Sequence, residues 1–241
     1  MVTLKMAMIF LMEQIRTPFS LIWTIMSPTV LFFFLHFNEI ELHYGDTAWL
    51  GKQISWFVGY ISFSVVLFNY CLYLVGRRES GFIATFVHNM DGRLLFIRSQ
   101  LIASLIMSIL YVFFFILVVL TGFQASPDYQ IVMIILKSIY INAFMMVSLT
   151  FMASFRVTFQ TASTIYSVLI TVCMVSGIVS LKYNEGIVYW INQVNPIAIY
   201  STILQSDQEL SLMTIFFYSI MLIISIISAL TFKTEPVWSS Q

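Results

Sequence analysis

The sequence predicts an all-α integral membrane protein with six transmembrane helices. Of its 241 residues, 60% are hydrophobic and only 9% are charged. A soluble domain usually has about 25% charged residues, so too few are present here to cover a water-facing surface. The hydrophobic residues also form continuous runs of the length a membrane helix needs, about 20 residues. Continuous runs favour helices over the alternating strands of a β-barrel.

Six apolar runs are each about long enough to cross a hydrocarbon core of roughly 30 Å as a helix. They lie near residues 19–37, 54–75, 101–123, 131–154, 162–180 and 211–230. Pro28 falls within the first run, where it removes a backbone donor and is expected to kink the helix. Six such helices with short loops use nearly the whole chain. We therefore expect one transmembrane domain over residues 1–241 and no separate catalytic domain.

The distribution of lysine and arginine predicts the orientation of these helices. Eight basic residues fall on one side: Lys5, Arg16, Arg77, Arg78, Arg93, Arg98, Arg156 and Lys233. The other side has only Lys52 and Lys182. Because cytoplasmic loops carry an excess of lysine and arginine, we expect both termini in the cytoplasm and the chain in the plasma membrane.

Three further segments are too short or too charged to be spans. Residues 1–17 are apolar, but their charged side chains cluster on one side of a helical wheel, which predicts an interfacial helix. Residues 77–99 form the longest cytoplasmic connection and have an apolar middle between charged ends. Residues 181–210 contain two short apolar stretches and are expected to form an outer, partly re-entrant hairpin before the last span.

The residues that catalysis, metal binding or ATP binding would need do not occur in a recognisable pattern. There is no His-Glu-x-x-His helix, no Gly-x-Ser-x-Gly turn and no acidic residue within a span. Gly76 and Gly81 have the spacing of a phosphate loop, but Phe82 and Ile83 stand where Lys and Ser or Thr would follow. We therefore expect a chain that is not an enzyme and holds no cofactor or metal. Eleven basic and eleven acidic residues balance, which argues against a nucleic-acid partner.

Three polar residues within the predicted spans are candidates for a translocation pathway. Lys137 is the single lysine, arginine or acidic residue there. Its long stem would either reach the outer surface or place the ammonium in a central cavity, where it meets a substrate or a partner subunit. Asn69 and Asn142 fit better as hydrogen-bonding residues between helices than as ligands.

The order of these segments resembles that of the permease subunit of an ABC-2 type (type V) ABC transporter. The resemblance covers nearly the whole chain. Its most telling stretch is Arg78-Glu79-Ser80-Gly81-Phe82, followed by Asp91-Gly92-Arg93 and Arg98. This stretch is similar to the charged element that opens the coupling helix in that family. The stretch Asn195-Pro196-x-x-x-Tyr200 is similar to the family's Asn-Pro segment before the last helix.

The resemblance implies an export mechanism driven by partner subunits. Two permeases, either two copies of this chain or one copy with a homologous permease, would surround a central pathway in the lipid bilayer. Two separate ABC ATPase subunits would hold ATP and Mg²⁺ and dock beneath them. The segment 79–90 would be the coupling helix that enters an ATPase groove. The residues implied in coupling are Arg78, Glu79, Gly81, Phe82, Ile83 and Phe86.

The same residues are also compatible with roles that differ from coupling and export. The arginines of the 77–99 connection could simply anchor it to anionic lipid headgroups. The chain could also be a non-transporting membrane sensor or assembly partner, or an intramembrane enzyme with a cryptic site. For an exporter, the aromatic content of 17% favours an amphipathic or hydrophobic cargo such as a peptide, a drug or a lipid-linked molecule. Co-purification with an ATPase would distinguish the exporter from the sensor and the enzyme.

Overall fold

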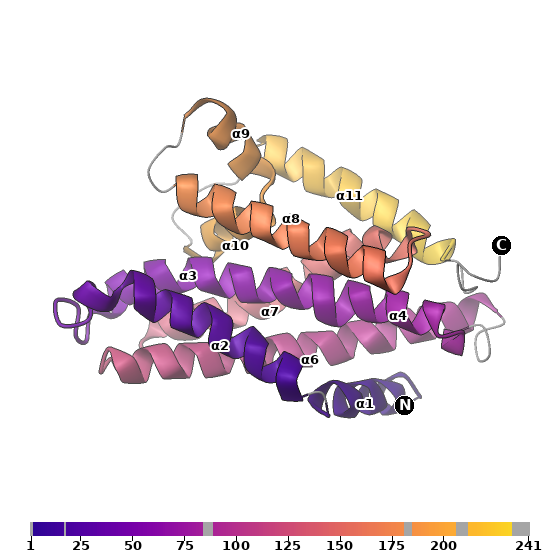
Figure 1. Cartoon of the computed structure of the whole chain (residues 1–241), viewed down its shortest axis with the longest axis horizontal. Coiled ribbons are helices and arrows are strands. Elements are labelled where there is room, and N and C mark those ends of the chain that lie inside the picture. Colours follow the sequence, from indigo (N-terminus) through magenta and orange to yellow (C-terminus); the bar gives the residue numbers. More distant parts are fainter. Residues whose placement is uncertain (1, 17, 84–88, 181–184, 206–211, 233–241) are drawn as a thin grey trace.

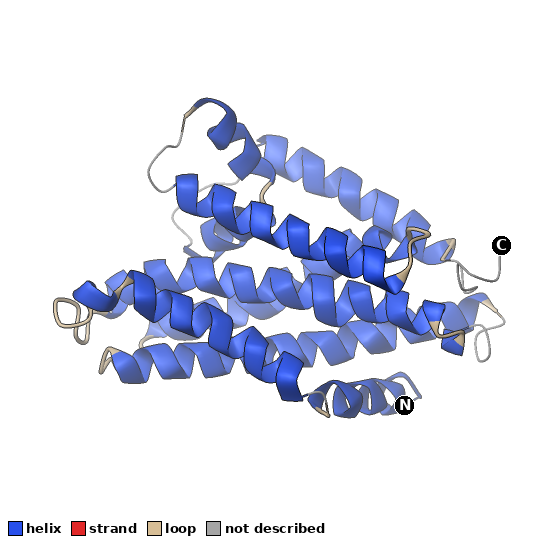
Figure 2. Ribbon diagram, in the orientation of Figure 1, coloured by secondary structure: helices blue, strands red, loops and turns tan. Residues whose placement is uncertain are grey.

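The computed structural model describes residues 2–16, 18–83, 89–180, 185–205 and 212–232, and within these ranges every regular element is a helix (Figure 2). The α-helices are α1 Val2–Ile15, α2 Pro18–Leu35, α3 Thr47–Ser64, α4 Tyr73–Glu79, α6 Met90–Gly122, α7 Tyr129–Ser154, α8 Phe159–Ser180, α9 Gly186–Val194, α10 Pro196–Gln205 and α11 Leu212–Leu230. A short 3₁₀ helix, η1, spans Phe37–Glu39, and a π-helix, η2, spans Val65–Leu72. The predicted all-α class is confirmed.

In the described part of the chain, four helices are long and apolar enough to cross a membrane. They are the continuous helix Thr47–Glu79, then Met90–Gly122, Tyr129–Ser154 and Phe159–Val179. These helices fall on four of the six predicted runs and support a multi-pass helical membrane protein. The first and sixth runs form α2 and α11, apolar helices of 18 and 19 residues. That these two also cross the membrane remains a prediction.

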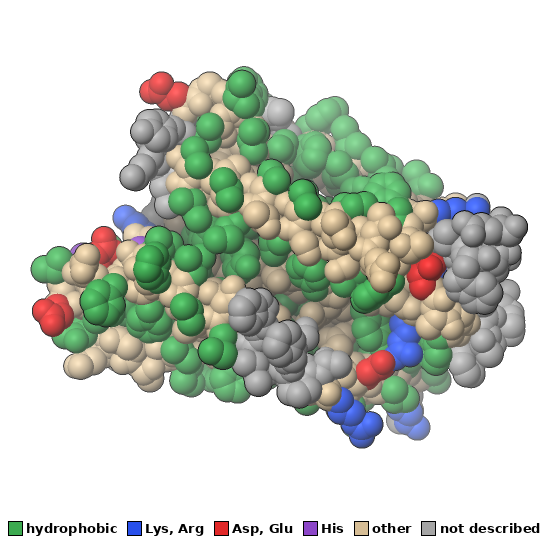
Figure 3. Space-filling model, in the orientation of Figure 1, with side chains coloured by type: hydrophobic (Ala, Val, Ile, Leu, Met, Phe, Trp, Pro, Cys, Tyr) green, Lys and Arg blue, Asp and Glu red, His purple; other side chains and the backbone are tan. Residues whose placement is uncertain are grey.

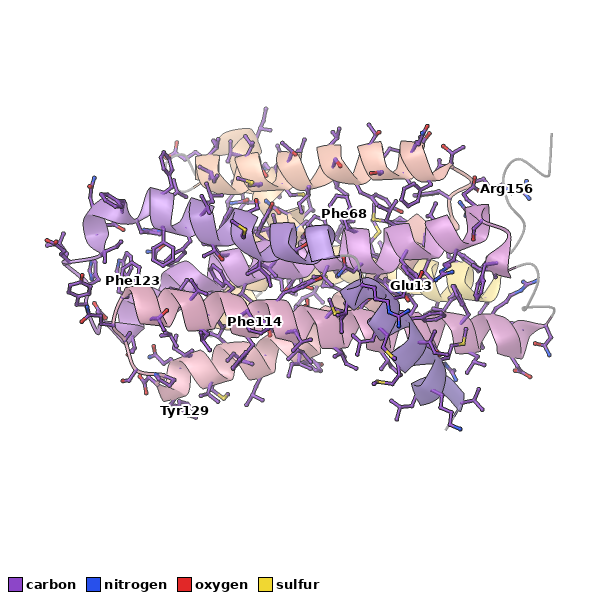
Figure 4. All side chains as sticks on the ribbon, turned by 60° about the horizontal axis from the view of Figure 1, so that its bottom comes forward. Glu13, Phe68, Phe114, Phe123, Tyr129 and Arg156 are labelled. Carbon is purple, nitrogen blue, oxygen red and sulfur yellow. The ribbon has the colours of Figure 1, made fainter. Side chains whose placement is uncertain are left out.

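The six apolar helices alternate in direction along the bundle (Figure 1). This alternation brings α1 and the last turn of α11 toward the same end of the molecule. Arg156 also lies toward that end, whereas Phe123 and Tyr129 lie at the opposite one (Figure 4). Figure 3 shows most of the visible lysine and arginine side chains toward the end that holds α1. The structure thus has one basic end, and its assignment to the cytoplasm remains a prediction.

The second predicted span is longer than the apolar run of residues 54–75. The helix begins at Thr47 because the Asp46 side chain caps it, accepting a hydrogen bond of 3.0 Å from the backbone N–H of Trp49. It continues without a break through η2 into α4 and ends at Glu79. The predicted boundaries were therefore too narrow at both ends, since capping and polar helical turns extend a helix beyond its apolar stretch.

In the segment predicted as an outer hairpin, the described residues form two short helices, α9 and α10, which meet at Asn195. The Asn195 side chain joins three segments: its Nδ2 donates to the Cys173 carbonyl at 2.8 Å, and its Oδ1 accepts from the Ile197 N–H at 3.0 Å. Helix α10 is buried against α3 and α7, whereas α9 has no buried residue. Whether the hairpin re-enters the membrane remains a prediction.

Helices α3 and α10 approach closely at Gly59. A Cβ atom placed on Gly59 would lie 2.8 Å from the Tyr200 Cβ and 2.9 Å from the Ile197 carbonyl oxygen. Non-bonded carbon atoms are normally about 3.5–4.0 Å apart, and a carbon and an oxygen keep a similar separation. Both distances at Gly59 are shorter than this. Only glycine therefore lets α10 lie at this depth in the bundle.

Candidate functional site

The helix that carries Arg77 is joined to α1 at the basic end of the bundle. Arg77 pairs with Glu13 of α1 and donates to the Tyr73 hydroxyl at 2.8 Å, while that hydroxyl donates to Glu13 at 2.6 Å. The guanidinium also lies over two rings, with its central carbon 4.7 Å from the Phe82 centroid and 5.0 Å from the Tyr73 centroid. These contacts connect α1, the end of α4 and the start of the 80–89 connection.

Arg78 points the opposite way and is buried, with 1% of its surface exposed. Its Nη1 donates to the Ala153 carbonyl at 3.1 Å, and its Nη2 donates to the Val157 carbonyl at 2.9 Å. Carbonyls at the end of a helix have no partner within that helix, so the guanidinium satisfies the end of α7 and the turn that follows. A docked subunit would not reach this side chain. Any part that Arg78 takes in coupling is therefore indirect, through the position of α7.

The helix expected to start at Glu79 does not start there, and this expectation is wrong. Glu79 is the last residue of α4, and Gly81 takes a φ of +72°, the left-handed conformation with which helices commonly end. Phe82, which is half-buried, and the buried Ile83 follow this turn in helical conformation. Residues 84–88, which include Phe86 and the middle of the predicted coupling helix 79–90, lie outside the described residues.

Asn142 forms a buried joint between three helices. Its Nδ2 donates to the Ser108 hydroxyl of α6 at 2.8 Å, and its Oδ1 accepts from the Tyr200 hydroxyl of α10 at 2.7 Å. Asn142 itself belongs to α7, and all three residues are buried. A buried amide that is hydrogen-bonded in this way holds helices together.

Asn69 lies in the π-helix η2 and also takes part in a joint between helices. A π-turn shifts backbone hydrogen bonding by one residue and leaves a carbonyl available to other groups. The Asn69 carbonyl accepts from Gln100 Nε2 at 2.7 Å and from the Ser104 hydroxyl at 3.0 Å, both on α6. Its side-chain amide donates to the Tyr111 hydroxyl at 3.4 Å. No feature of the apolar run 54–75 indicated a π-helix.

Lys137 differs from the two asparagines because it lines a cavity. The cavity has a volume of about 330 Å³ and lies between α3, α7 and the end of α10. The Lys137 ammonium is 3.4 Å from the Ile203 carbonyl and 3.5 Å from the Leu204 carbonyl. Lys52 of α3, which was expected in an outer loop, lines the same cavity. The structure therefore separates the three pathway candidates into one cavity residue and two residues that join helices.

No protein-family model matches this chain. Among the described residues, no group of three histidine, cysteine or acidic side chains is arranged to hold a metal ion. The two cysteines, Cys71 and Cys173, are free thiols buried in the bundle. Two features of the described residues are candidates for contact with other molecules: residues 80–83 at the basic end and the cavity lined by two lysines.

Proposed function

We propose that this chain is the transmembrane subunit of an ATP-driven ABC exporter of the ABC-2 type. The observation that carries the proposal is the length of the two helices that flank the 80–89 connection. The helices Thr47–Glu79 and Met90–Gly122 have 33 residues each. A 33-residue α-helix is about 50 Å long at 1.5 Å per residue. This exceeds the hydrocarbon core of roughly 30 Å and also the full bilayer of about 40–45 Å.

In α6 the excess length falls at the basic end, and the helix Thr47–Glu79 extends past the apolar run 54–75 at both ends. Residues 99–122 of α6 contain no charged side chain, whereas Asp91, Arg93 and Arg98 lie in its first turns. Residues 90–98 therefore extend into or beyond the headgroups, and α4 accompanies them. A pair of helices that projects in this way presents its connection to proteins in the cytoplasm, which is what a coupling segment requires.

Three contacts give this projecting connection a means of moving the rest of the bundle. Phe82 lies against Arg77, and Arg77 pairs with Glu13 of α1. Arg78 binds the end of α7 and the turn before α8. A displacement of the connection by a docked ATPase would therefore act on α1, α7 and α8 together. Lipid anchoring by the same arginines is compatible with this role.

In this proposal ATP and Mg²⁺ are held by separate ABC ATPase subunits, and the pathway forms between this chain and a second permease, identical or homologous. Both termini lie in the cytoplasm and the chain resides in the plasma membrane. The cargo is an amphipathic or hydrophobic molecule that moves outward. The connections on the side predicted to face outward are too short for a substrate-capturing domain, which favours export over import.

The test is a search for an ABC ATPase gene beside the gene for this chain, followed by co-expression of the two proteins. We expect the ATPase to co-purify in detergent, and its rate of ATP hydrolysis to change when the complex is placed in proteoliposomes. A chain that purifies stably alone, with no retained ATPase and no change in hydrolysis, would instead support a sensor or assembly partner. Loss of a hydrolytic activity of the isolated chain on a single serine or histidine change would support an intramembrane enzyme.

A further inference from the structure

The cavity between α3, α7 and α10 has an unusual charge composition for a site within a membrane bundle. Among the described residues that line it, two are lysines, Lys52 and Lys137, and none is acidic. Its other polar groups include Ser55 and Gln130, while Met133 supplies apolar surface. A volume of about 330 Å³ lies at the lower end of the range of ligand pockets, about 300–1,000 Å³.

Neither lysine has a charged partner among the described residues. The ion pairs there involve His36, His43, Arg77 and Arg78, and none includes Lys52 or Lys137. Two described carboxylates at this end directly precede α3 and α7. Asp46 and Asp128 cap these helices by accepting backbone N–H groups, and neither lines the cavity. Lys52 is exposed and Lys137 is partly buried. Two ammonium groups that line one cavity favour an anion between them.

The helix ends around the cavity add to this preference. The first turns of α3 and α7 contribute Ala48, Tyr129 and Gln130 to the lining, and the positive ends of helix dipoles favour anions. The end of α10 has the opposite polarity, and it is the end that Lys137 contacts through the carbonyls of Ile203 and Leu204. These carbonyls carry partial charges only, so they neutralise part of one ammonium and none of the other.

From these features we infer that the cavity is a binding site for the anionic group of an amphipathic molecule, a carboxylate or a phosphate, with Lys52 and Lys137 as its cationic ligands. The apolar part of the molecule would lie against Met133, Ile134 and Leu204, which line the same cavity. The anionic group could belong to a membrane lipid or to a soluble amphiphile, since the chemistry of recognition is the same. The inference stands independently of ATP-driven export.

The experiment measures ligand-induced stabilisation in micelles of a neutral detergent. Thermal unfolding is followed by the reaction of Cys71 and Cys173 with a fluorogenic maleimide, because both thiols are buried in the folded chain. The probes are octyl phosphate below its micellar concentration, octanol as the uncharged equivalent, and inorganic phosphate. The variants are Lys52→Gln, Lys137→Gln and the double variant. Lys5→Gln on α1 is the matched control, because Lys5 is an exposed lysine that does not line the cavity.

We expect octyl phosphate to raise the unfolding midpoint of the wild type and of Lys5→Gln, and to bind each single variant about tenfold to a hundredfold more weakly. The double variant should show no shift, and octanol should shift none of the proteins. An equal octyl phosphate shift in the wild type and the double variant would overturn the inference. So would octanol acting as strongly as octyl phosphate, or inorganic phosphate alone giving the full shift.

Two further measurements separate the alternatives that remain. If Lys137 merely caps α10, Lys137→Gln should lower the midpoint without ligand and leave the octyl phosphate shift unchanged, which would also overturn the inference. Nanodiscs of phosphatidylglycerol and of phosphatidylcholine identify the source of the anion. A wild-type midpoint that rises in phosphatidylglycerol, but not in the double variant, supports a lipid ligand. A shift that appears only when octyl phosphate is added supports a soluble one. Neither measurement uses ATP or an ATPase, so failure here is distinct from failure of the proposed export function.

Discussion

Replacing Gly59 by alanine should separate α3 from α10 and destabilise the bundle. The added Cβ would meet the Tyr200 Cβ at 2.8 Å and the Ile197 carbonyl oxygen at 2.9 Å. The carbonyl oxygen belongs to the backbone and the Tyr200 Cβ is fixed to it, so neither can rotate away, and one helix must move. Such overpacking typically costs about 1–3 kcal/mol. Alanine also has a higher helix propensity than glycine, which stabilises the folded state by about 1 kcal/mol. The measured change in unfolding free energy would therefore be smaller than the cost of the clash.

Gly51→Ala is the matched control for this change. Gly51 lies in the same helix, and a Cβ there would meet its nearest neighbour, the Gln130 Oε1, at 3.6 Å, an ordinary contact. Both variants gain the same helix propensity, so the difference between them reports the clash. We expect Gly59→Ala to be less stable than Gly51→Ala by about 1–3 kcal/mol, which corresponds to about 2–12 °C in a chain of this size.

The assay is thermal unfolding in neutral detergent, read from the exposure of the buried thiols of Cys71 and Cys173. A Gly59→Ala midpoint equal to or above that of Gly51→Ala would refute the reasoning. It would mean that α10 does not lie against α3 at this depth, and the placement of α10 within the bundle would have to be revised.

Three other predictions concern orientation and the basic end. Cysteines introduced at Asp46 and Asp128 should react with an impermeant maleimide in intact cells, and cysteines at Ser80 and Arg156 should not; equal labelling of Asp46 and Ser80 would exclude the proposed orientation. Arg78→Met leaves the Ala153 and Val157 carbonyls without their donor. It should lower the free energy of unfolding by about 1.5–3 kcal/mol for each charged hydrogen bond lost. Arg78→Lys should cause a smaller loss of stability in the same thiol assay. The double change Phe82→Ala and Phe86→Ala should abolish ATPase pull-down, at about 2 kcal/mol for each aromatic side chain, without affecting membrane insertion; equal recovery of the ATPase would mean that this stretch rests only on lipid.

The long helices could be predicted from the sequence because a membrane span has a simple signature. An apolar run of sufficient length is enough to place α6, α7 and α8, and it needs no knowledge of tertiary packing. The boundaries of the second span could not be predicted in this way. Its start depends on a side-chain cap at Asp46, and its interior contains a π-helix whose freed Asn69 carbonyl is satisfied by a different helix.

The candidate site was predictable only for residues that stand out chemically. Lys137 is conspicuous as a lysine in an apolar run, and the structure places it in a cavity. Lys52 was missed because the span was expected to begin after it; once the helix begins at Thr47, Lys52 lies on its second turn and lines the same cavity. Arg78 was expected at a surface, but two backbone carbonyls that only the folded chain brings together hold it inside.

The cavity and the projecting connection are linked because they lie on the same two helical units. Lys52 and Glu79 belong to one continuous helix, and Lys137 and Ala153 both belong to α7. Arg78 binds these two units to each other at the basic end through the Ala153 carbonyl. At the cavity end the same units meet around the two lysines.

Between the two ends lies η2, where backbone hydrogen bonding already departs from the α-helical pattern and the Asn69 carbonyl accepts hydrogen bonds from α6. π-helical turns inside α-helices frequently occur at functional sites. In the proposed exporter, a movement imposed on Glu79 and Phe82 would therefore reach the cavity either as a rigid tilt of the whole helix or as a change confined to η2. The Gln100 and Ser104 hydrogen bonds to Asn69 oppose the second of these.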